Sequence, residues 1–283
     1  MKITMEAIST FFVKRTFHLR FLLARGTKKS KLYKKFIDKL LFEDDEMYIL
    51  PNDNSLKTSE KIEVNEVIEE SEVSFLPSDV LKEVIKQSNH IVIMKNCLCR
   101  ISNDCKDYPH DIGCIFIGKT TKKISRDFCY EASPQEAIEH VDKAISHGLT
   151  HLIGKNKIDS LWMNAKPAKD LLTICHCCPC CCLWKVLPEL EESISDKCKR
   201  LPDLKVELNN DKCINCNKCL KGICFTNAIS LENKKIKINQ NLCRGCGRCV
   251  DICSSNAITL NYTDKSIDTV LNRIPQLIDL KNN

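Results

Sequence analysis

The sequence has few glycines and lacks the motifs on which common nucleotide-dependent enzymes rely. It contains eight glycines in 283 residues, which leaves little room for the glycine-rich loops that bind phosphates or dinucleotides. It also shows no serine–histidine triad and no paired-carboxylate site. We therefore expect any chemistry of this chain to take place at a metal.

Long apolar runs are also missing. The apolar residues near the N-terminus are interrupted by Lys14, Arg15, Arg20 and Arg25, and no small-residue cleavage site follows them. We expect neither a secretory signal nor a membrane-spanning helix. The expected location is cytoplasmic.

The formal net charge of +6 is distributed unevenly. Residues 1–42 are basic, with apolar residues at helical spacing, and predict an amphipathic helical segment. Residues 43–74 are acidic and predict a linker or a peripheral layer. Packing of the basic helix on its own domain is favoured over contact with a membrane surface through residues 1–25. Nucleic acid is not an expected partner, because no reader motif accompanies the basic residues.

Cysteine, in contrast, is abundant, with twenty residues in the chain. A chain of this length can bury a core without cross-links, so structural disulfides are not needed for folding. In a reducing cytosol, clustered cysteines are metal ligands or redox catalysts more often than disulfides. The composition therefore predicts a metalloprotein, and so many thiols favour an anaerobic source.

A cysteine-rich repeat lies near the C-terminus. DKCINCNKCLKGICFTNAISL at 211–231 aligns with NLCRGCGRCVDICSSNAITL at 241–260. The two-residue spacing lets successive loop cysteines converge on one small cluster. Residues of about 205–262 thereby resemble the bacterial-type two-cluster [4Fe-4S] ferredoxins. A zinc ribbon would use four of these cysteines and leave four others without a role.

The ferredoxin resemblance implies a crossed set of ligands, in which the fourth cysteine of each repeat serves the other cluster. It assigns the first cluster to Cys213, Cys216, Cys219 and Cys253, and the second to Cys243, Cys246, Cys249 and Cys224. Two departures from the family pattern stand out. The first repeat has one extra residue before its fourth cysteine, and neither fourth cysteine is followed by proline.

A second concentration of cysteines occurs in CHCCPCCC at 175–182, which we call the cysteine knot. Six neighbouring thiols cannot all ionise unless cations neutralise them, so metal occupancy is favoured. Pro179 argues against a continuous helix. If the segment is extended, side chains alternate. One face then holds Cys175, Cys177 and Cys181, and the other holds Cys178, Cys180 and Cys182.

Four upstream cysteines, Cys97, Cys99, Cys105 and Cys114, are expected to join the knot in an N-terminal cluster site or sites. The ten cysteines exceed the eight that two cubanes need. They predict one or two further iron–sulfur clusters, including the alternative of a larger or unusual cluster. Cys129 and Cys198 stand apart and are interpreted as ordinary thiols.

The fold class expected is α+β. Residues 75–200 predict a cysteine-rich mixed α/β domain, 203–263 the two-cluster ferredoxin domain, and 264–283 a C-terminal tail. Ser133 to Glu136 form a helix start with a capping box, LTHLIG and SLWMN predict strands, and LLTI leads into the knot. A Cys-x-Cys-Arg segment followed by such a knot and a ferredoxin module is similar to a group of mostly uncharacterised iron–sulfur proteins of anaerobic archaea and bacteria.

Some neighbouring residues are candidates for tuning a cluster. Arg100 can hydrogen-bond to a cluster sulfide, and His176, or less favourably His151, can act as a non-cysteine ligand. An ordinary ion pair for Arg100 and ordinary buried histidines are the alternatives. Trp162 and Trp184 are expected to shield a cluster from water.

The function that these residues favour is electron transfer between the ferredoxin module and the N-terminal cluster or clusters, within a larger redox or reductive-activation complex. Lysines and arginines around the ferredoxin loops favour a redox partner with an acidic docking surface. The alternatives are a reductase whose N-terminal cluster is catalytic and a protein of cluster assembly or metal storage.

Overall fold

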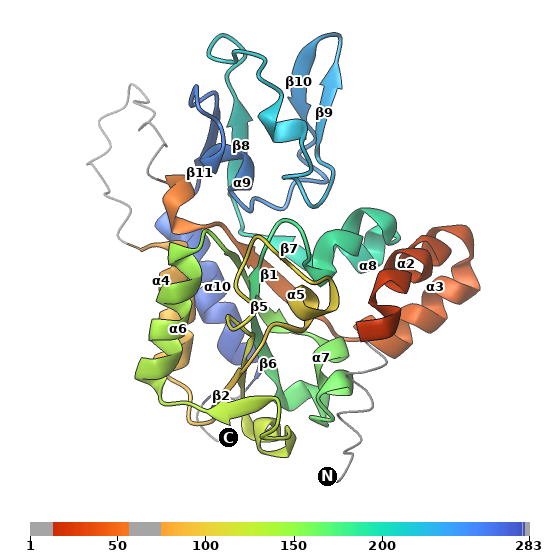
Figure 1. The fold of residues 1–283 in the computed structure, drawn as a ribbon, viewed down its shortest axis with the longest axis vertical. Coiled ribbons are helices and arrows are strands. Elements are labelled where there is room, and N and C mark those ends of the chain that lie inside the picture. Colours follow the sequence, from red (N-terminus) through yellow and green to blue (C-terminus); the bar gives the residue numbers. More distant parts are fainter. Residues whose placement is uncertain (1–13, 57–74, 279, 281–283) are drawn as a thin grey trace.

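The computed structural model describes residues 14–56, 75–278 and 280. These residues form an α+β fold, as the sequence predicts, with a central sheet, helices on both of its faces and a small cysteine-rich module at one end (Figure 1). The first 13 residues, which hold part of the expected basic helix, and residues 57–74, which hold most of the expected acidic segment, lie outside the described residues.

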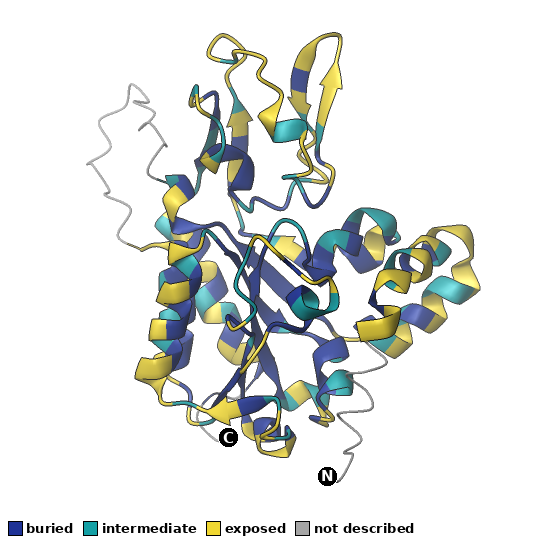
Figure 2. Ribbon diagram, viewed as in Figure 1, coloured by how far each residue is buried: buried dark blue, intermediate teal, exposed yellow. Residues whose placement is uncertain are grey.

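The central sheet has seven strands in the order β4-β2-β3-β6-β5-β1-β7. Neighbouring strands are antiparallel, except for the parallel pair β1 and β7. The strands are β1 (Glu46–Leu50), β2 (Ile91–Met94), β3 (Ile115–Ile117), β4 (Cys129–Glu131), β5 (Thr150–Lys155), β6 (Leu172–Cys177) and β7 (Cys198–Arg200). All six residues of β6 are buried (Figure 2), because other elements pack on both faces of the sheet.

One face of the sheet packs against α4 (Pro77–Lys86), α6 (Pro134–Ser146) and α10 (Asp264–Leu277). The predicted capping box at the start of α6 is confirmed: the backbone N–H of Glu136 donates to Ser133 Oγ, and the Glu136 carboxylate accepts from the Ser133 N–H. The apolar side chains of the three helices meet Ile93, Ile153 and Ile174 of the sheet in one buried core. This layer makes β6 a rigid support for the cysteines that follow it.

The opposite face is covered by shorter elements. They are α2 (Arg20–Lys29), α3 (Lys31–Ile37), α5 (Leu98–Ser102), α7 (Lys157–Trp162), α8 (Glu192–Ser195) and the 3-10 helix η6 (Leu183–Glu189). Cys175 and Cys177 of β6 belong to the core beneath them, together with Trp184. The remaining short helical elements are η1 (Phe17–Leu19), η2 (Asp38–Phe42), η3 (Asp53–Leu56), η4 (Lys119–Lys123) and η5 (Ala168–Asp170).

The C-terminal module contains two antiparallel two-stranded sheets, the hairpin of β9 with β10 and the pair of β8 with β11. Its elements are β8 (Lys205–Leu208), η7 (Lys218–Leu220), β9 (Ile229–Glu232), β10 (Lys235–Ile238), α9 (Arg248–Asp251) and β11 (Ile258–Asn261). Val206, Val250 and Leu260 of this module belong to the same buried core as Leu50 of the central sheet. The module is therefore packed on the rest of the protein through apolar contacts, while its outer loops are exposed (Figure 2).

Three local expectations differ from the structure. Residues 46–50, expected within a linker or peripheral layer, form β1 inside the central sheet, because Met47, Ile49 and Leu50 supply a fully buried apolar run amid the acidic residues. Residues 264–277, expected as a tail, form the amphipathic helix α10, which packs on α4. The first three residues of SLWMN form the end of helix α7, which begins after the Asn156 cap, and Met163 and Asn164 follow in a turn rather than in a strand.

Within the part of the chain that the structure describes, no helix has both the length and the apolar character required to cross a bilayer.

Candidate functional site

The cysteine knot does not continue the strand that delivers it. β6 ends at Cys177, and residues 178–182 turn back around Pro179. Cys175 and Cys177 face the same side, as alternation predicts, but Cys182 joins them in place of Cys181. The predicted two-face assignment is therefore wrong for these two residues, because side-chain alternation holds only while the backbone remains extended.

A buried cavity of about 40 Å³ lies between β6, α5 and η6; we call it the cysteine chamber. Seven cysteines line it: the upstream Cys97, Cys99 and Cys114 and the knot residues Cys175, Cys177, Cys178 and Cys182. Cys178 also belongs to a second group described below, and we call the other six the chamber cysteines. Phe116, Trp162 and Trp184 complete much of the apolar wall. The chamber thus collects thiols from two segments, 97–114 and 175–182. Cys97, Cys175, Cys177 and Cys182 are buried, whereas Cys99 and Cys114 are partly exposed.

The chamber thiols are close enough to perturb one another. The Sγ atoms of Cys177 and Cys182 lie 3.0 Å apart, and those of Cys114 and Cys175 lie 3.7 Å apart. Hydrogen bonds from Cys175 and Cys182 hold the pKa of Cys177 well below its usual value. Burial and the Cys177 thiolate in turn raise the pKa of Cys182. All six thiols can be thiolates together only with cations among them.

Arginine side chains surround these thiols. Arg100 is fully buried, and its Nη1 donates to the carbonyl oxygen of His176 at 3.0 Å. Arg248 is 4% exposed, and its guanidinium donates to Thr150 Oγ1 and to the carbonyl oxygen of Cys177. Burial lowers the pKa of Arg20 in α2, and the negative charge of the nearby Cys99 and Cys182 opposes this shift in part.

Each of these arginines keeps one buried nitrogen without a hydrogen-bond partner among the described residues: Arg20 Nε, Arg100 Nε and Arg248 Nη1. A buried, unpaired N–H is costly. Sulfide and thiolate sulfurs of an iron–sulfur cluster are acceptors for such groups. Soft thiolate donors, nearby positive charge and orphaned N–H groups together fit an anionic iron–sulfur cluster in the chamber.

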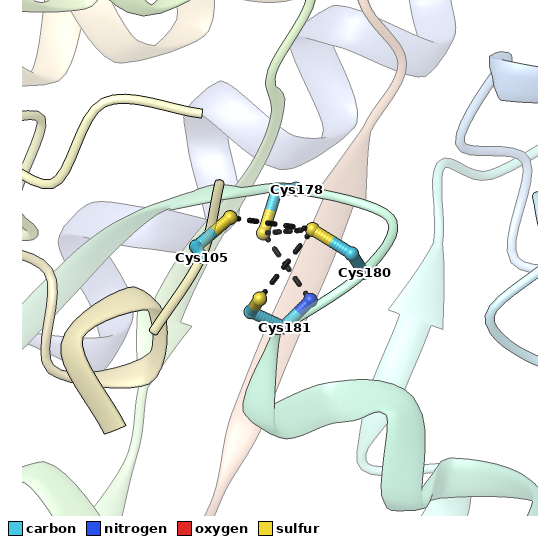
Figure 3. Close-up of side chains that lie close together, drawn as sticks. All are labelled: Cys105, Cys178, Cys180 and Cys181. Carbon is cyan, nitrogen blue, oxygen red and sulfur yellow. Dashed lines mark hydrogen bonds between the residues drawn. The ribbon is translucent and has the colours of Figure 1, made fainter. Parts of the chain in front are cut away.

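A second group of cysteines adjoins the chamber and shares Cys178 with its wall. Cys105, Cys178, Cys180 and Cys181, which we call the tetrathiol group, point their sulfurs toward one another (Figure 3). The group packs against Ala144 of α6, on the opposite side of the sheet from Cys175 and Cys177. The ten N-terminal cysteines are therefore divided six and four.

The eight cysteines of the C-terminal module surround two smaller cavities of about 20 Å³ each. One is lined by Cys213, Cys216, Cys219 and Cys253, and the other by Cys224, Cys243, Cys246 and Cys249. These are the crossed sets that the ferredoxin resemblance implies. Backbone amides approach the thiols, since the N–H of Ala228 donates to Cys224 Sγ at 3.2 Å.

The two repeats use different residues at matching left-handed positions. Asn215 and Asn217 have positive φ in the first repeat, and Gly245 and Gly247 have positive φ in the second. A Cβ on Gly247 would lie 2.4 Å from the hydroxyl of Ser55 in η3, so glycine permits close packing here. The glycines mark the repeat that docks on the main sheet, a signal that our sequence interpretation missed.

The candidate histidines direct their rings toward one another, although His176 is also among the residues that line the chamber. The rings of His151 and His176 meet through their Nδ1 atoms at 2.9 Å, and burial lowers the pKa of both. The His176 ring also contacts His140 of α6, on the opposite face from Cys175. Cys129 and Cys198 are buried on β4 and β7 and line neither the chamber nor the module cavities.

The arrangement of the C-terminal cysteines agrees with the comparison against protein families. Residues 205–254 match the 4Fe-4S dicluster domain family. This match includes all eight module cysteines and supports an iron–sulfur, ferredoxin-like module; together with the cysteine clusters it supports an electron-transfer role. Neither the curated proteins nor the solved structures gave a match to the chain.

Proposed function

We propose that this chain is an iron–sulfur electron-transfer protein in which the dicluster module exchanges electrons with a further iron–sulfur cluster held in the cysteine chamber. The six chamber cysteines would supply the ligands of that cluster, and the two crossed sets would hold those of the module. Iron–sulfur clusters supply one-electron chemistry when bound. The protein's own residues determine where the electron is stabilised and from which side it enters.

The observation that carries this proposal is the position of Arg248. It directly precedes Cys249 of the second module cavity, and its guanidinium donates to the carbonyl oxygen of Cys177 in the chamber wall at 2.7 Å. Cys246 of the same module cavity packs on the core that contains Cys177 and Cys182. The second module site and the chamber are therefore adjacent, with a positive charge between them.

The first module site, lined by Cys213, Cys216, Cys219 and Cys253, faces solvent and is the favoured point at which electrons enter the protein. Cys216 is exposed, and Ile214 beside it is 64% exposed. Lys218 and Lys221 extend the basic character of this loop. An acidic redox partner would dock here. Electrons would then pass from this exposed site to the second module site, which we call the docked site because it lies against the main domain, and from there to the chamber.

A reductase function for the chamber is the second candidate. Six cysteines line it besides Cys178 of the tetrathiol group, whereas a cubane takes four. Two thiols would therefore remain for a substrate such as a disulfide or for a larger cluster. We favour electron relay over a reductase function, because Trp162 and Trp184 in the chamber wall restrict the access of a substrate. Turnover of disulfides with a reduced donor would favour the reductase.

The test of electron relay is a single-electron pulse given anaerobically to the purified full chain and followed by freeze-quench EPR. Reduction should appear first in the module and then redistribute to the chamber. In Cys114→Ser, which removes a chamber thiol, the electron should stay in the module. Cys129→Ser changes a buried cysteine outside the chamber and should behave as wild type. If wild type and Cys114→Ser end with the same distribution, electron relay to the chamber is refuted.

A further inference from the structure

The tetrathiol group differs in geometry from every other cysteine set in the described residues. Cys180 Sγ lies 3.5 Å from the Sγ atoms of Cys105 and Cys178 and 3.4 Å from that of Cys181. All four sulfurs lie within 4.8 Å of one another, and no other group of three or more potential ligands within residues 14–56, 75–278 and 280 is that compact. The sulfurs converge on one point (Figure 3).

This spacing suits one metal ion. Four thiolates at about 2.3 Å from a tetrahedral ion have sulfurs about 3.8 Å apart. The thiolates of a cubane lie farther apart, because four irons and four sulfides stand between them. The two module sets in this same structure are cysteines arranged for cubanes, and neither meets the 4.8 Å limit. The contrast within one molecule separates the tetrathiol group from cluster sites.

We propose that Cys105, Cys178, Cys180 and Cys181 hold a single tetrahedral Zn²⁺ ion. The sequence grouped these four cysteines with the other N-terminal cluster ligands; their distances favour a separate, mononuclear site. Zn²⁺ binds such donors more tightly than Fe²⁺ does. Binding replaces four thiol protons by one divalent ion and leaves the metal redox-inert and fully coordinated, as in structural zinc sites.

The local backbone supports this ligand set. Cys178 and Cys181 are separated by two residues, and the N–H of Cys181 donates to Cys178 Sγ at 3.4 Å, which turns the chain so that both thiols face the same point. Cys105 follows α5, and the Nε2 of His110 lies 2.8 Å from its carbonyl oxygen. Three ligands therefore come from one tight turn and the fourth from a separate loop.

The position of this zinc ion indicates a structural role beside the chamber. Cys178 directly follows Cys177, and Cys181 directly precedes Cys182, so two zinc ligands adjoin two chamber cysteines. Cys105 belongs to the loop that follows Cys97 and Cys99 of the opposite chamber wall. The ion would thus fasten both walls of the chamber without being part of the electron path.

The test uses the full chain, purified without oxygen, with metal quantitation and X-ray absorption at the zinc edge. We expect about one zinc per chain with a single shell of four sulfurs at about 2.3 Å and no iron neighbour. Cys105→Ser should lose the zinc, whereas the matched variant Cys114→Ser should keep it and lose chamber iron. Co²⁺ supplied in place of Zn²⁺ should give the intense visible bands of a tetrahedral tetrathiolate, absent in Cys105→Ser.

Two results would overturn the site. One is iron in place of zinc, either as a single ion or as a cluster. The other is zinc that survives unchanged in both Cys105→Ser and Cys181→Ser. The inference and the electron-transfer proposal fail separately, since the first depends on zinc content and its sulfur shell and the second on where the electron resides among the iron centres. If Cys105→Ser fails to accumulate, cobalt spectra of wild type alone still decide the coordination.

Discussion

Arg248 Nη2 donates to the carbonyl oxygen of Cys177 at 2.7 Å, while its Nε donates to Thr150 Oγ1 at 2.9 Å. One side chain from the module thereby holds the ends of β5 and β6, where the chamber begins. Its nearest neighbour in sequence, Cys249, lines the docked module cavity. A buried guanidinium between the two proposed cluster sites would stabilise an added electron on either of them.

Replacing Arg248 by alanine should lower the reduction potentials of the chamber centre and of the docked module centre. The loss of one positive charge near each should cost about 1–2 kcal/mol, or roughly 40–80 mV for a one-electron couple. An EPR-monitored redox titration measures both. Arg248→Lys keeps the positive charge and should have reduction potentials close to those of wild type. Thr150→Val removes one hydrogen-bond acceptor of Arg248 but no charge, and it should change the reduction potentials little. Unchanged potentials in Arg248→Ala would refute the charge effect.

Chamber iron should depend on Cys114 and not on Cys129. Cys114 lies 3.7 Å from Cys175 inside the chamber, whereas Cys129 is 1% exposed on β4 and contacts Arg126 instead. Anaerobic iron and sulfide quantitation should show a loss confined to the N-terminal domain in Cys114→Ser. Full iron content in that variant, or an equal loss in Cys129→Ser, would contradict the proposed ligand set.

Crossed ligation in the module predicts a specific pattern of non-additivity. Cys224→Ser and Cys246→Ser affect one cavity, so the double variant should lose no more than about four irons. Cys224→Ser combined with Cys216→Ser affects both cavities and should lose about eight. If each repeat bound its own cluster, the two double variants would exchange these outcomes.

Asp45 should make folding stability depend on pH. Burial raises its pKa to about 8, because only the backbone N–H of Lys157 pairs with its carboxyl. The folded chain therefore favours the protonated form. Its contribution is complete below the ordinary pKa near 4 and is lost as the pH rises toward 8.

Asp45→Asn should remove this dependence. The thermal unfolding midpoint of Asp45→Asn should therefore rise relative to that of wild type between pH 6 and pH 8. The neighbouring Asp44 is exposed, and Asp44→Asn should follow the wild-type curve. A midpoint difference between Asp45→Asn and wild type that stays constant over this range would show that Asp45 is ionised in the folded state.

Local sequence signals predicted much of the fold and of the module. The Ser133 capping box fixed the start of α6, and the α+β class was correct. Recurrent cysteine spacing placed the dicluster module, because ligand spacing along one loop is a local property. β1 was missed because its five residues lie among acidic ones, and α10 was missed because its role depends on distant helices.

Sequence periodicity could not predict how the cysteines of the knot divide between the chamber and the tetrathiol group. A strand pattern applies up to Cys177, but the turn around Pro179 sends Cys181 and Cys182 to opposite sites. The fourth member of the tetrathiol group, Cys105, is brought there by a long-range contact. The role of Arg248 likewise depends on how the module docks, although its place beside a ligand cysteine was visible in the repeat.

The most direct test of the central claim is an anaerobic reductive titration of the intact chain, followed by EPR and matched to iron content. We predict more than the two interacting [4Fe-4S] centres of the module, with an additional centre whose signal is broadened by spin coupling to the docked site and is missing in Cys114→Ser. Eight irons per chain, with only the two module centres detected in a fully folded protein, would contradict the account.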